Sequence, residues 1–213
     1  MPIHMQTPTQ TRMPIDPGRR AILGLAAGAA AIAVLPGPAR ALDAARAKVL
    51  VDKLVADINA VISSGRSESQ MFRDFERIFD RYADVPTIAR YALGVDARRA
   101  SAAQLREFTQ VFKRYISVKY GRRFREFIGG RIVVNEARKI KSFFEVKTTA
   151  HLRGEAPFAV TFLVSNRSGA DKFFNMFIEG VNMLLTERTE IGAMLDARGG
   201  DIDRMIADLR KIG

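Results

Sequence analysis

Residues 143–178 read FFEVKTTAHLRGEAPFAVTFLVSNRSGADKFFNMFI, and this stretch decides the fold. Apolar and polar side chains alternate in it with a period of two, which predicts β-strands. Short segments rich in Gly, Pro, Asn and Asp separate the strands and favour turns. Strands joined this tightly form an antiparallel meander. With a similar segment upstream, the sequence predicts four strands, at residues 131–137, 143–152, 158–165 and 172–178.

The segments before and after the strands have helical periodicity, with apolar residues three or four positions apart. Ser101 and Gln104 form a capping-box pattern that starts a long helix, which we expect Gly121 to end. The chain therefore predicts an α+β fold, in which helices wrap around a four-stranded antiparallel sheet. The other predicted helices cover residues 43–62, 67–82, 87–93 and 201–211, with a further helix after Gly180.

One face of the predicted sheet is strongly apolar. Val146 and Thr148 share it in the second strand, and Val160 and Phe162 share it in the third. Helices must cover this face to keep it from water. Its side chains either fill a packed core or line a cavity, and the alternation is compatible with both.

The first 41 residues have the features of an export signal. A polar start ends in Arg19-Arg20, and the small residues Ala39 and Ala41 precede the expected cleavage site. Between them lies an uncharged apolar stretch of 15 residues, 21–35, which is shorter than the ~20 residues of a spanning helix. We expect residues 1–41 to be a cleaved, twin-arginine-like export signal. The general secretory route and an uncleaved anchor are the alternatives. We expect residues 42–213 to form a single domain.

Several kinds of chemistry are excluded by composition. The chain has no Cys and no Trp, and residues 42–213 contain one His, His151. Thiolate zinc sites, Cys nucleophiles and disulfides are therefore impossible. The glycine-rich nucleotide-binding motifs and the serine-hydrolase and metalloprotease motifs do not occur. The sequence provides no positive evidence for an enzyme, a metal or a cofactor.

Positive charge is concentrated in one segment. The chain has 34 Lys and Arg against 23 Asp and Glu, a net charge of +11. Residues 113–141 hold ten basic and two acidic residues, and so carry the whole net charge of +8 of residues 42–213. In an exported protein such a patch suits anionic lipid head groups or an acidic protein partner better than nucleic acid. A solvated face without a role is the alternative.

Short motifs occur in an order typical of one protein family. They are IARYALG at 88–94, the long-helix residues Gln104, Phe108 and Phe112, FIEGVN at 177–182 with Arg188 after it, and GDIDRMIADL at 200–209. With these motifs the chain resembles the MlaC family, also called the toluene-tolerance family, over residues 49–209. Members are periplasmic carriers that move phospholipid between the two membranes of Gram-negative envelopes.

The resemblance implies a soluble periplasmic carrier, expected to be a monomer, with no catalysis and no cofactor. Phospholipid would be its cargo, held in an apolar cavity between the sheet and the helices. The implied protein partners are an inner-membrane ABC transporter complex and an outer-membrane lipoprotein complex, with no role for nucleic acid. Two alternatives remain: a carrier for hopanoid or another apolar lipid, and a non-transporting interaction module of the envelope with the same fold.

We expect the cavity to lie where the apolar face of the sheet meets the apolar stripes of the helices. The expected lining residues are Val146, Thr148, Val160, Phe162, Met176 and Ile178 from the sheet, and Ile88, Tyr91, Phe108 and Phe112 from the helices. The basic segment is expected to form a docking patch near the mouth of this cavity. Its residues are Lys119, Arg122, Arg123 and Arg125.

Overall fold

The computed structural model of the chain describes residues 41–124 and 130–213. The expected export signal, apart from Ala41, lies outside the described residues, and so does Arg125 of the expected docking patch. Within the two described ranges, no helix has the length and apolar character needed to cross a membrane.

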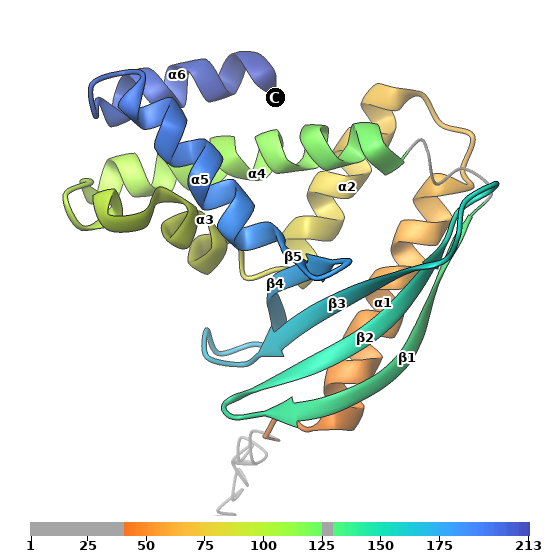
Figure 1. The fold of residues 1–213 in the computed structure, drawn as a ribbon. Coiled ribbons are helices and arrows are strands. Elements are labelled where there is room, and N and C mark those ends of the chain that lie inside the picture. The colour runs from red at the N-terminus through yellow and green to blue at the C-terminus, as the bar shows by residue number, and fades with distance from the viewer. Residues whose placement is uncertain (1–40, 125–129) are drawn as a thin grey trace, which may run out of the picture. The chain divides into compact units, whose positions relative to one another are not determined.

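The strands of an antiparallel sheet follow one another in chain order, and the sheet lies to one side of the main group of helices (Figure 1). The strands are β1 (Arg131–Ile140), β2 (Phe143–His151), β3 (Phe158–Ser165), β4 (Lys172–Ile178) and β5 (Val181–Asn182). The predicted α+β class and meander are confirmed, but the sheet has a fifth strand that was not predicted. β5 pairs with Phe177 and Ile178 across a tight turn, and its two residues are too few to show an alternation.

The helices begin and end close to the predicted positions. They are α1 (Ala44–Ile62), α2 (Glu68–Tyr82), α3 (Val85–Leu93), the 3₁₀ helix η1 (Gly94–Arg98), α4 (Ala102–Phe124), α5 (Met183–Asp196) and α6 (Ile202–Ile212). The capping box of α4 is present: Gln104 N donates to Ser101 Oγ at 3.1 Å, and Ser101 N donates to Gln104 Oε1 at 2.9 Å. Local side-chain caps therefore determine where the helices start.

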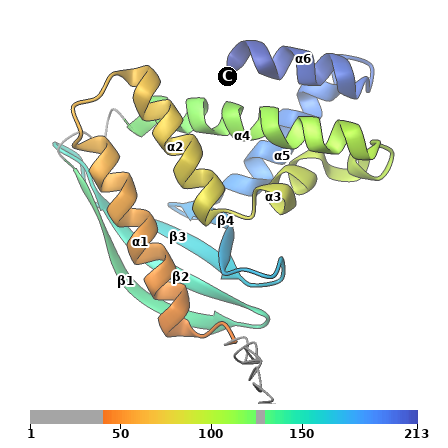
Figure 2. The ribbon, with the colours of Figure 1, turned by 180° about the vertical axis from the view of Figure 1, so that it is seen from behind.

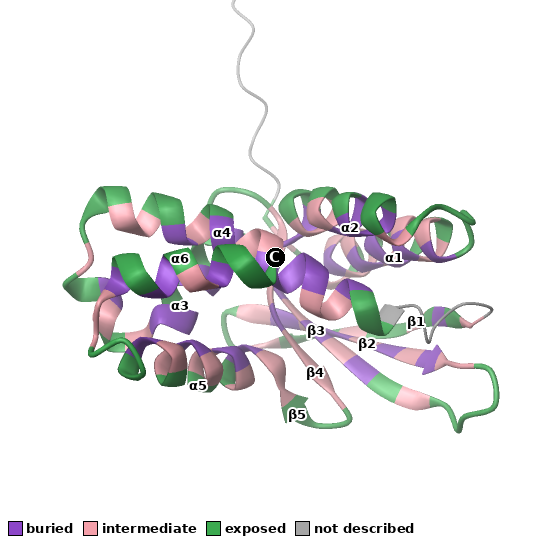
Figure 3. Cartoon of the chain, turned by 90° about the horizontal axis from the view of Figure 1, so that it is seen from above, coloured by how far each residue is buried: buried purple, intermediate pink, exposed green. Residues whose placement is uncertain are grey.

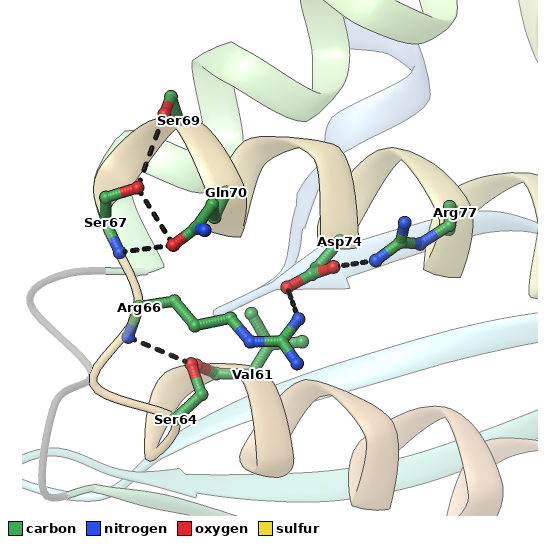
Figure 4. A network of polar contacts seen from close by, with 8 residues as sticks. All are labelled: Val61, Ser64, Arg66, Ser67, Ser69, Gln70, Asp74 and Arg77. Carbon is green, nitrogen blue, oxygen red and sulfur yellow. Dashed lines mark hydrogen bonds and ion pairs between the residues drawn. The ribbon is translucent and has the colours of Figure 1, made fainter.

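The loop between α1 and α2 is held by the polar contacts drawn in Figure 4. Gln70 Oε1 accepts hydrogen bonds from the backbone N–H and the hydroxyl of Ser67, at 3.1 and 3.0 Å. Asp74, a buried residue of α2, accepts from Arg66 of the loop at 2.7 Å and also pairs with Arg77. The two arginines neutralise the buried carboxylate, and the bond from Arg66 fixes the loop to α2.

The helices cover the sheet unequally. α1 runs along one face of β1, β2 and β3, while α3, α4, α5 and α6 pack on one another beyond it (Figures 1 and 2). Buried and half-buried residues alternate along β2 (Figure 3). The buried Phe144, Val146 and Ala150 belong to the same hydrophobic core as residues of α1. The core therefore continues from the sheet under α1 into the group of helices.

The turn between α2 and α3 is bonded directly to β4. Asp84 N donates to the carbonyl oxygen of Phe173 at 2.8 Å, and Lys172 Nζ donates to the carbonyl oxygen of Asp80 at 3.1 Å. Because β5 pairs only with the last two residues of β4, this turn occupies the strand edge that β5 leaves open. The contact joins the sheet to the group of helices.

α4 continues through Gly121 to Phe124, so the expectation that Gly121 ends this helix is wrong. α2 packs against α4 at this point. A Cβ atom on Gly121 would lie 2.6 Å from Cδ1 of Phe72 and 3.3 Å from Cδ2 of Phe75. Gly121 allows two aromatic rings of α2 to approach the backbone of α4, and this role in packing is invisible to local helix rules.

We predict opposite effects for two glycine-to-alanine changes within helices. Gly192→Ala in α5, where a Cβ would meet nothing within 4 Å, should raise the free energy of unfolding by about 0.5–1 kcal/mol. Gly121→Ala should lower it by about 1–3 kcal/mol, because overpacking outweighs the gain in helix propensity. Urea denaturation followed by circular dichroism measures both. Equal stabilisation by the two changes would show that the ring of Phe72 can move away from the added methyl group without a loss of stability.

Candidate functional site

A cavity lies between the helices and the sheet. Residues of α1, α2, α3, α4 and α5 form one side of it, and residues of β1, β3 and β4 form the other. The space free of atoms is about 1050 Å³, including the part that is open to solvent.

The wall of the cavity is mainly aromatic and aliphatic. The ring of Phe173 in β4 packs edge-on against Phe162 of β3, with centroids 5.6 Å apart, and tilted against Phe79 of α2 at 6.2 Å. All three residues line the cavity. Contacts between these rings hold the sheet and α2 at a fixed separation. The lining is suited to a ligand with a large apolar part.

Four lining residues carry polar side chains, Ser117, Tyr120, Asn175 and Glu187. Ser117 Oγ donates to the carbonyl oxygen of Lys113 at 2.8 Å. Asn175 Oδ1 accepts from the backbone of Met176 and Leu184, and its Nδ2 donates to Asn182 at 3.0 Å. The bond of Ser117 stays within α4, whereas Asn175 of β4 holds β5 and the start of α5. Tyr120 and Glu187 belong to a charged cluster.

The charged cluster joins α4 to α5 and consists of Tyr115, Lys119, Tyr120, Glu187 and Glu190. Lys119 Nζ donates to Glu187 Oε1 at 2.8 Å and to Glu190 Oε2 at 2.5 Å. The hydroxyls of Tyr120 and Tyr115 donate to the same two oxygens, at 2.5 and 2.9 Å. Charge-assisted hydrogen bonds of this kind are strong when they are shielded from water.

The environment of the cluster keeps its tyrosines neutral and its charges in place. Burial, with the charge of Glu187 next, raises the pKa of both Tyr115 and Tyr120. Burial alone would lower the pKa of Lys119, but its hydrogen bonds to Glu187 and Glu190 raise it overall. For Glu190, burial acts to raise the pKa, but the hydrogen bonds from Lys119 and Tyr115 outweigh the effect of burial. The pKa of Glu190 is therefore lowered overall.

The directions of these pKa shifts determine the pH range over which the charged cluster stabilises the fold. A lowered pKa means that Glu190 stabilises the fold above its unfolded pKa and loses this effect as the pH falls through the folded value. A raised pKa means that Lys119 contributes fully below its unfolded pKa and loses this effect only as the pH rises through the folded value. Near neutral pH, Lys119 and Glu190 are therefore both charged.

The ten expected lining residues fall into two groups. Those that line the cavity are Ile88, Val160, Phe162, Met176 and Ile178. Val146 and Thr148 are instead buried on the part of β2 under α1, where Thr148 Oγ1 donates to the carbonyl oxygen of Val160 at 2.8 Å. Tyr91 is 40% exposed, with the guanidinium of Arg188 5.2 Å from its ring centre.

Phe108 and Phe112 are fully buried but lie outside the lining. They belong to the same stripe of α4 as Ile116 and Tyr120, each four residues further along, and those two residues do line the cavity. The stripe is continuous, but only its C-terminal half faces the cavity, because the N-terminal half packs in the group of helices with α6.

Sequence reasoning missed the contributions of α1, α2 and α5 to the wall. Phe75, Ile78 and Phe79 of α2 line the cavity, and the helical stripe that includes Phe75 and Ile78 could have indicated them. Glu187 of α5 also lines it, and nothing in the local pattern distinguishes this residue from an exposed helix glutamate.

The basic segment is divided by the fold. Lys113 pairs with Asp80 at 3.2 Å, Arg114 with Glu76 at 3.5 Å, and Arg138 with Glu145. Lys119 of the expected docking patch is paired with the carboxylates of the charged cluster. Arg122 and Arg123 are exposed and make no ion pair with a described residue. Acidic residues of α2 and α5, distant in sequence, thus neutralise part of the segment.

Residues that could hold a metal ion do not gather in the described part of the chain. Fold and cavity together define an α+β protein that can enclose an apolar ligand between a meander and its helices. The sequence profile of the family described as MlaC protein matches residues 48–211. The chain belongs to the MlaC family.

A solved structure has a similar fold. It is the phospholipid-binding protein from Ralstonia solanacearum, determined in complex with a phospholipid at 1.53 Å. The TM-score is 0.65 at 20% sequence identity, and the alignment covers 76% of this chain and 98% of that chain. A comparison with curated proteins found no match.

We predict that Lys119 and Glu187 depend on each other for stability. Lys119→Met should lower the free energy of unfolding by about 3 kcal/mol, at the low end for a buried pair because a quarter of the Lys119 side chain is exposed. Adding Glu187→Gln should recover part of this loss, since the buried carboxylate no longer lacks its cation. A double-mutant cycle by urea denaturation measures the coupling. If the loss of stability in the double variant equals the sum of the losses in the two single variants, Lys119 and Glu187 do not interact.

Proposed function

We propose that this protein is a periplasmic carrier that binds phospholipid in the cavity between its helices and its sheet. The proposal rests on one observation, the apolar wall of the cavity. It extends from Leu54 of α1 and Phe75 of α2 to Phe162 of β3 and Met176 of β4. In the proposed complex, the acyl chains lie against this wall, and the polar head stays close to water.

The energetics of lipid transfer favour a deep cavity over a surface groove. A two-chain phospholipid has about 30 methylene groups, and each is worth ~0.8 kcal/mol on leaving water. A carrier must therefore replace ~25 kcal/mol of contact with the bilayer interior, by the same estimate. The lining suits acyl chains because it is mainly apolar and its few polar side chains are mostly engaged with the protein itself.

Two comparisons support the proposal. The chain belongs to the MlaC family, and a protein with a similar fold was solved with a phospholipid bound. By the family resemblance, the carrier shuttles lipid between an inner-membrane ABC transporter complex and an outer-membrane lipoprotein complex. Residues 1–41 would direct the chain to the periplasm, as their export-signal pattern indicates.

The proposed role is binding without chemical conversion of the lipid. The hydroxyl of Ser117 is bonded to a backbone carbonyl. The carboxylate of Glu187 is bonded to Lys119 and Tyr120. Among the described lining residues, no serine, threonine or cysteine is hydrogen-bonded to a base, the arrangement that acyl transfer from a lipid commonly uses.

We predict that a charge in the cavity wall removes lipid without unfolding the protein. Val160→Glu should reduce the phospholipid that co-purifies with the protein about tenfold or more, because burying a carboxylate against acyl chains costs more than 1.4 kcal/mol. Ala159→Glu is the matched control, since Ala159 is the exposed neighbour on the same strand. Mass spectrometry of organic extracts gives lipid per protein, and circular dichroism checks the fold. Full lipid retention in folded Val160→Glu would place the binding site elsewhere.

Arg122 and Arg123 at the C-terminal end of α4 are the described residues of the expected docking patch that are not paired in the charged cluster. Both are exposed, and Gly121, beside them on α4, lines the cavity. Positive charge near the opening would steer the carrier to an acidic surface, over a Debye length of ~8 Å at physiological ionic strength. The patch would thus act on the rate of docking and not on lipid binding.

We predict that reversing these two charges slows docking while lipid stays bound. Arg122→Glu/Arg123→Glu should reduce the association rate with vesicles of anionic lipid about tenfold at low salt, and flatten its salt dependence. Arg98→Glu/Arg106→Glu makes the same change of charge at exposed positions before and at the start of α4 and should have a smaller effect. Stopped-flow kinetics at several salt concentrations measures the rates. Equal slowing by both pairs would indicate a general charge effect and no patch.

A further inference from the structure

One polar atom of a residue that lines the cavity has no hydrogen-bond partner among the described groups. Glu187 Oε1 accepts from both Lys119 and Tyr120, whereas Glu187 Oε2 is buried and accepts from no described group. In the described part of the chain, Asn59 Oδ1 is the other buried side-chain atom of this kind, and Asn59 does not line the cavity. A buried carboxylate oxygen without a donor is costly, so it indicates a donor on the ligand.

We propose that Glu187 Oε2 binds the polar head of the lipid and selects head groups that carry a hydrogen-bond donor. This inference rests on the proposed function, because it assigns the head-group end of the same cavity. The ammonium of ethanolamine or the hydroxyl of glycerol can supply the donor. The quaternary ammonium of choline has no N–H and cannot.

The position of the charged cluster fits a head-group site. Exposure of the side chains increases from Glu187 at 4% to Lys119 at 26% and Glu190 at 41%. The cluster therefore extends from the cavity wall to solvent. A lipid with its chains in the cavity can place its head beside Glu187 while part of that head stays hydrated, which avoids the cost of burying a phosphate.

The charge of the cluster favours an ammonium over a neutral donor. Glu187 and Glu190 carry two negative charges, and Lys119 supplies one positive charge. Near neutral pH the five residues of the cluster thus have one negative charge in excess, while Arg123 acts on Glu190 from outside the cluster. A head-group ammonium would both donate to Glu187 Oε2 and balance this charge.

A competition experiment tests the preference. The purified wild-type protein is incubated with vesicles that contain equal amounts of phosphatidylethanolamine, phosphatidylglycerol and phosphatidylcholine, all with the same acyl chains. The protein is re-isolated, and its lipid is identified by mass spectrometry. We expect enrichment of phosphatidylethanolamine over phosphatidylcholine by about tenfold, the effect of one hydrogen bond to a charged group. Enrichment of phosphatidylglycerol as well would show that a hydroxyl donor suffices.

Two isosteric variants separate the direct contact from the charge of the cluster. Glu187→Gln places an amide N–H₂ where Oε2 was, while its carbonyl oxygen can still accept from Lys119 and Tyr120. It should abolish the enrichment. Glu190→Gln changes the same charge at another partner of Lys119 that does not line the cavity, and it should lower the enrichment only in part, because Glu187 Oε2 is still free to accept. Loss of the enrichment in both variants would overturn the assignment to Glu187.

A series of lipids gives an independent measurement that needs no variant. Mono- and dimethylated phosphatidylethanolamine keep at least one N–H and the same positive charge, and only the trimethylated form, phosphatidylcholine, has none. We expect the enrichment to persist through the dimethylated lipid and to fall at the last methyl group. A gradual fall with each methyl group would indicate size selection and overturn the hydrogen bond.

The failures of the two proposals are distinguishable. Equal recovery of the three head groups by the wild-type protein would overturn the head-group inference and leave phospholipid binding intact. Recovery of no phospholipid at all would overturn the proposed function itself.

Discussion

The apolar face of the sheet has to be kept from water, and the helices cover it in two ways. α1 packs directly on β1 and β2, so Val146 is fully buried there. Along β3 and β4 the same kind of side chain, such as Phe162 and Met176, lines a cavity instead. The cavity lies over the part of the sheet that the protein's own side chains do not cover. This incomplete coverage is the physical basis of the proposed lipid binding.

The side of the cavity opposite the sheet depends on how closely two helices approach each other. Phe72 and Phe75 of α2 come within contact distance of α4 because residue 121 has no side chain. Gly121 and Phe75 both line the cavity, so the close approach of α2 to α4 also shapes this part of its wall. The bond from Asp84 to Phe173 attaches the end of α2 to β4. Together these contacts hold the two sides of the cavity at a fixed separation.

The arrangement of α4 and α5 also brings the residues of the charged cluster together. Two glutamates of α5 and one lysine of α4 meet where the cavity wall approaches solvent. In the proposed function, this cluster is the polar end of a site whose other surfaces are apolar, a division that matches the two ends of a lipid. The exposed Arg122 and Arg123 follow the cluster on α4, so head-group recognition and docking would be neighbouring tasks of one helix.

Local patterns in the chain were sufficient for the α+β class, the order of the strands and most helix ends. Alternation with a period of two specifies which side chains of β2 and β3 share a face, and a cap such as Ser101 with Gln104 specifies where a helix begins. These features depend on residues a few positions apart, which is why sequence reasoning reached them.

Tertiary structure decided the rest. Whether an apolar face becomes core or cavity depends on which element covers it, so Phe112 was expected in the lining and lies in the core, while Phe75 was missed. The role of Gly121 comes from Phe72, 49 positions earlier in the chain. The partners of Lys119 come from a helix that begins beyond the whole sheet. Contacts between distant segments leave no local period, because each partner alone has the pattern of an ordinary helix.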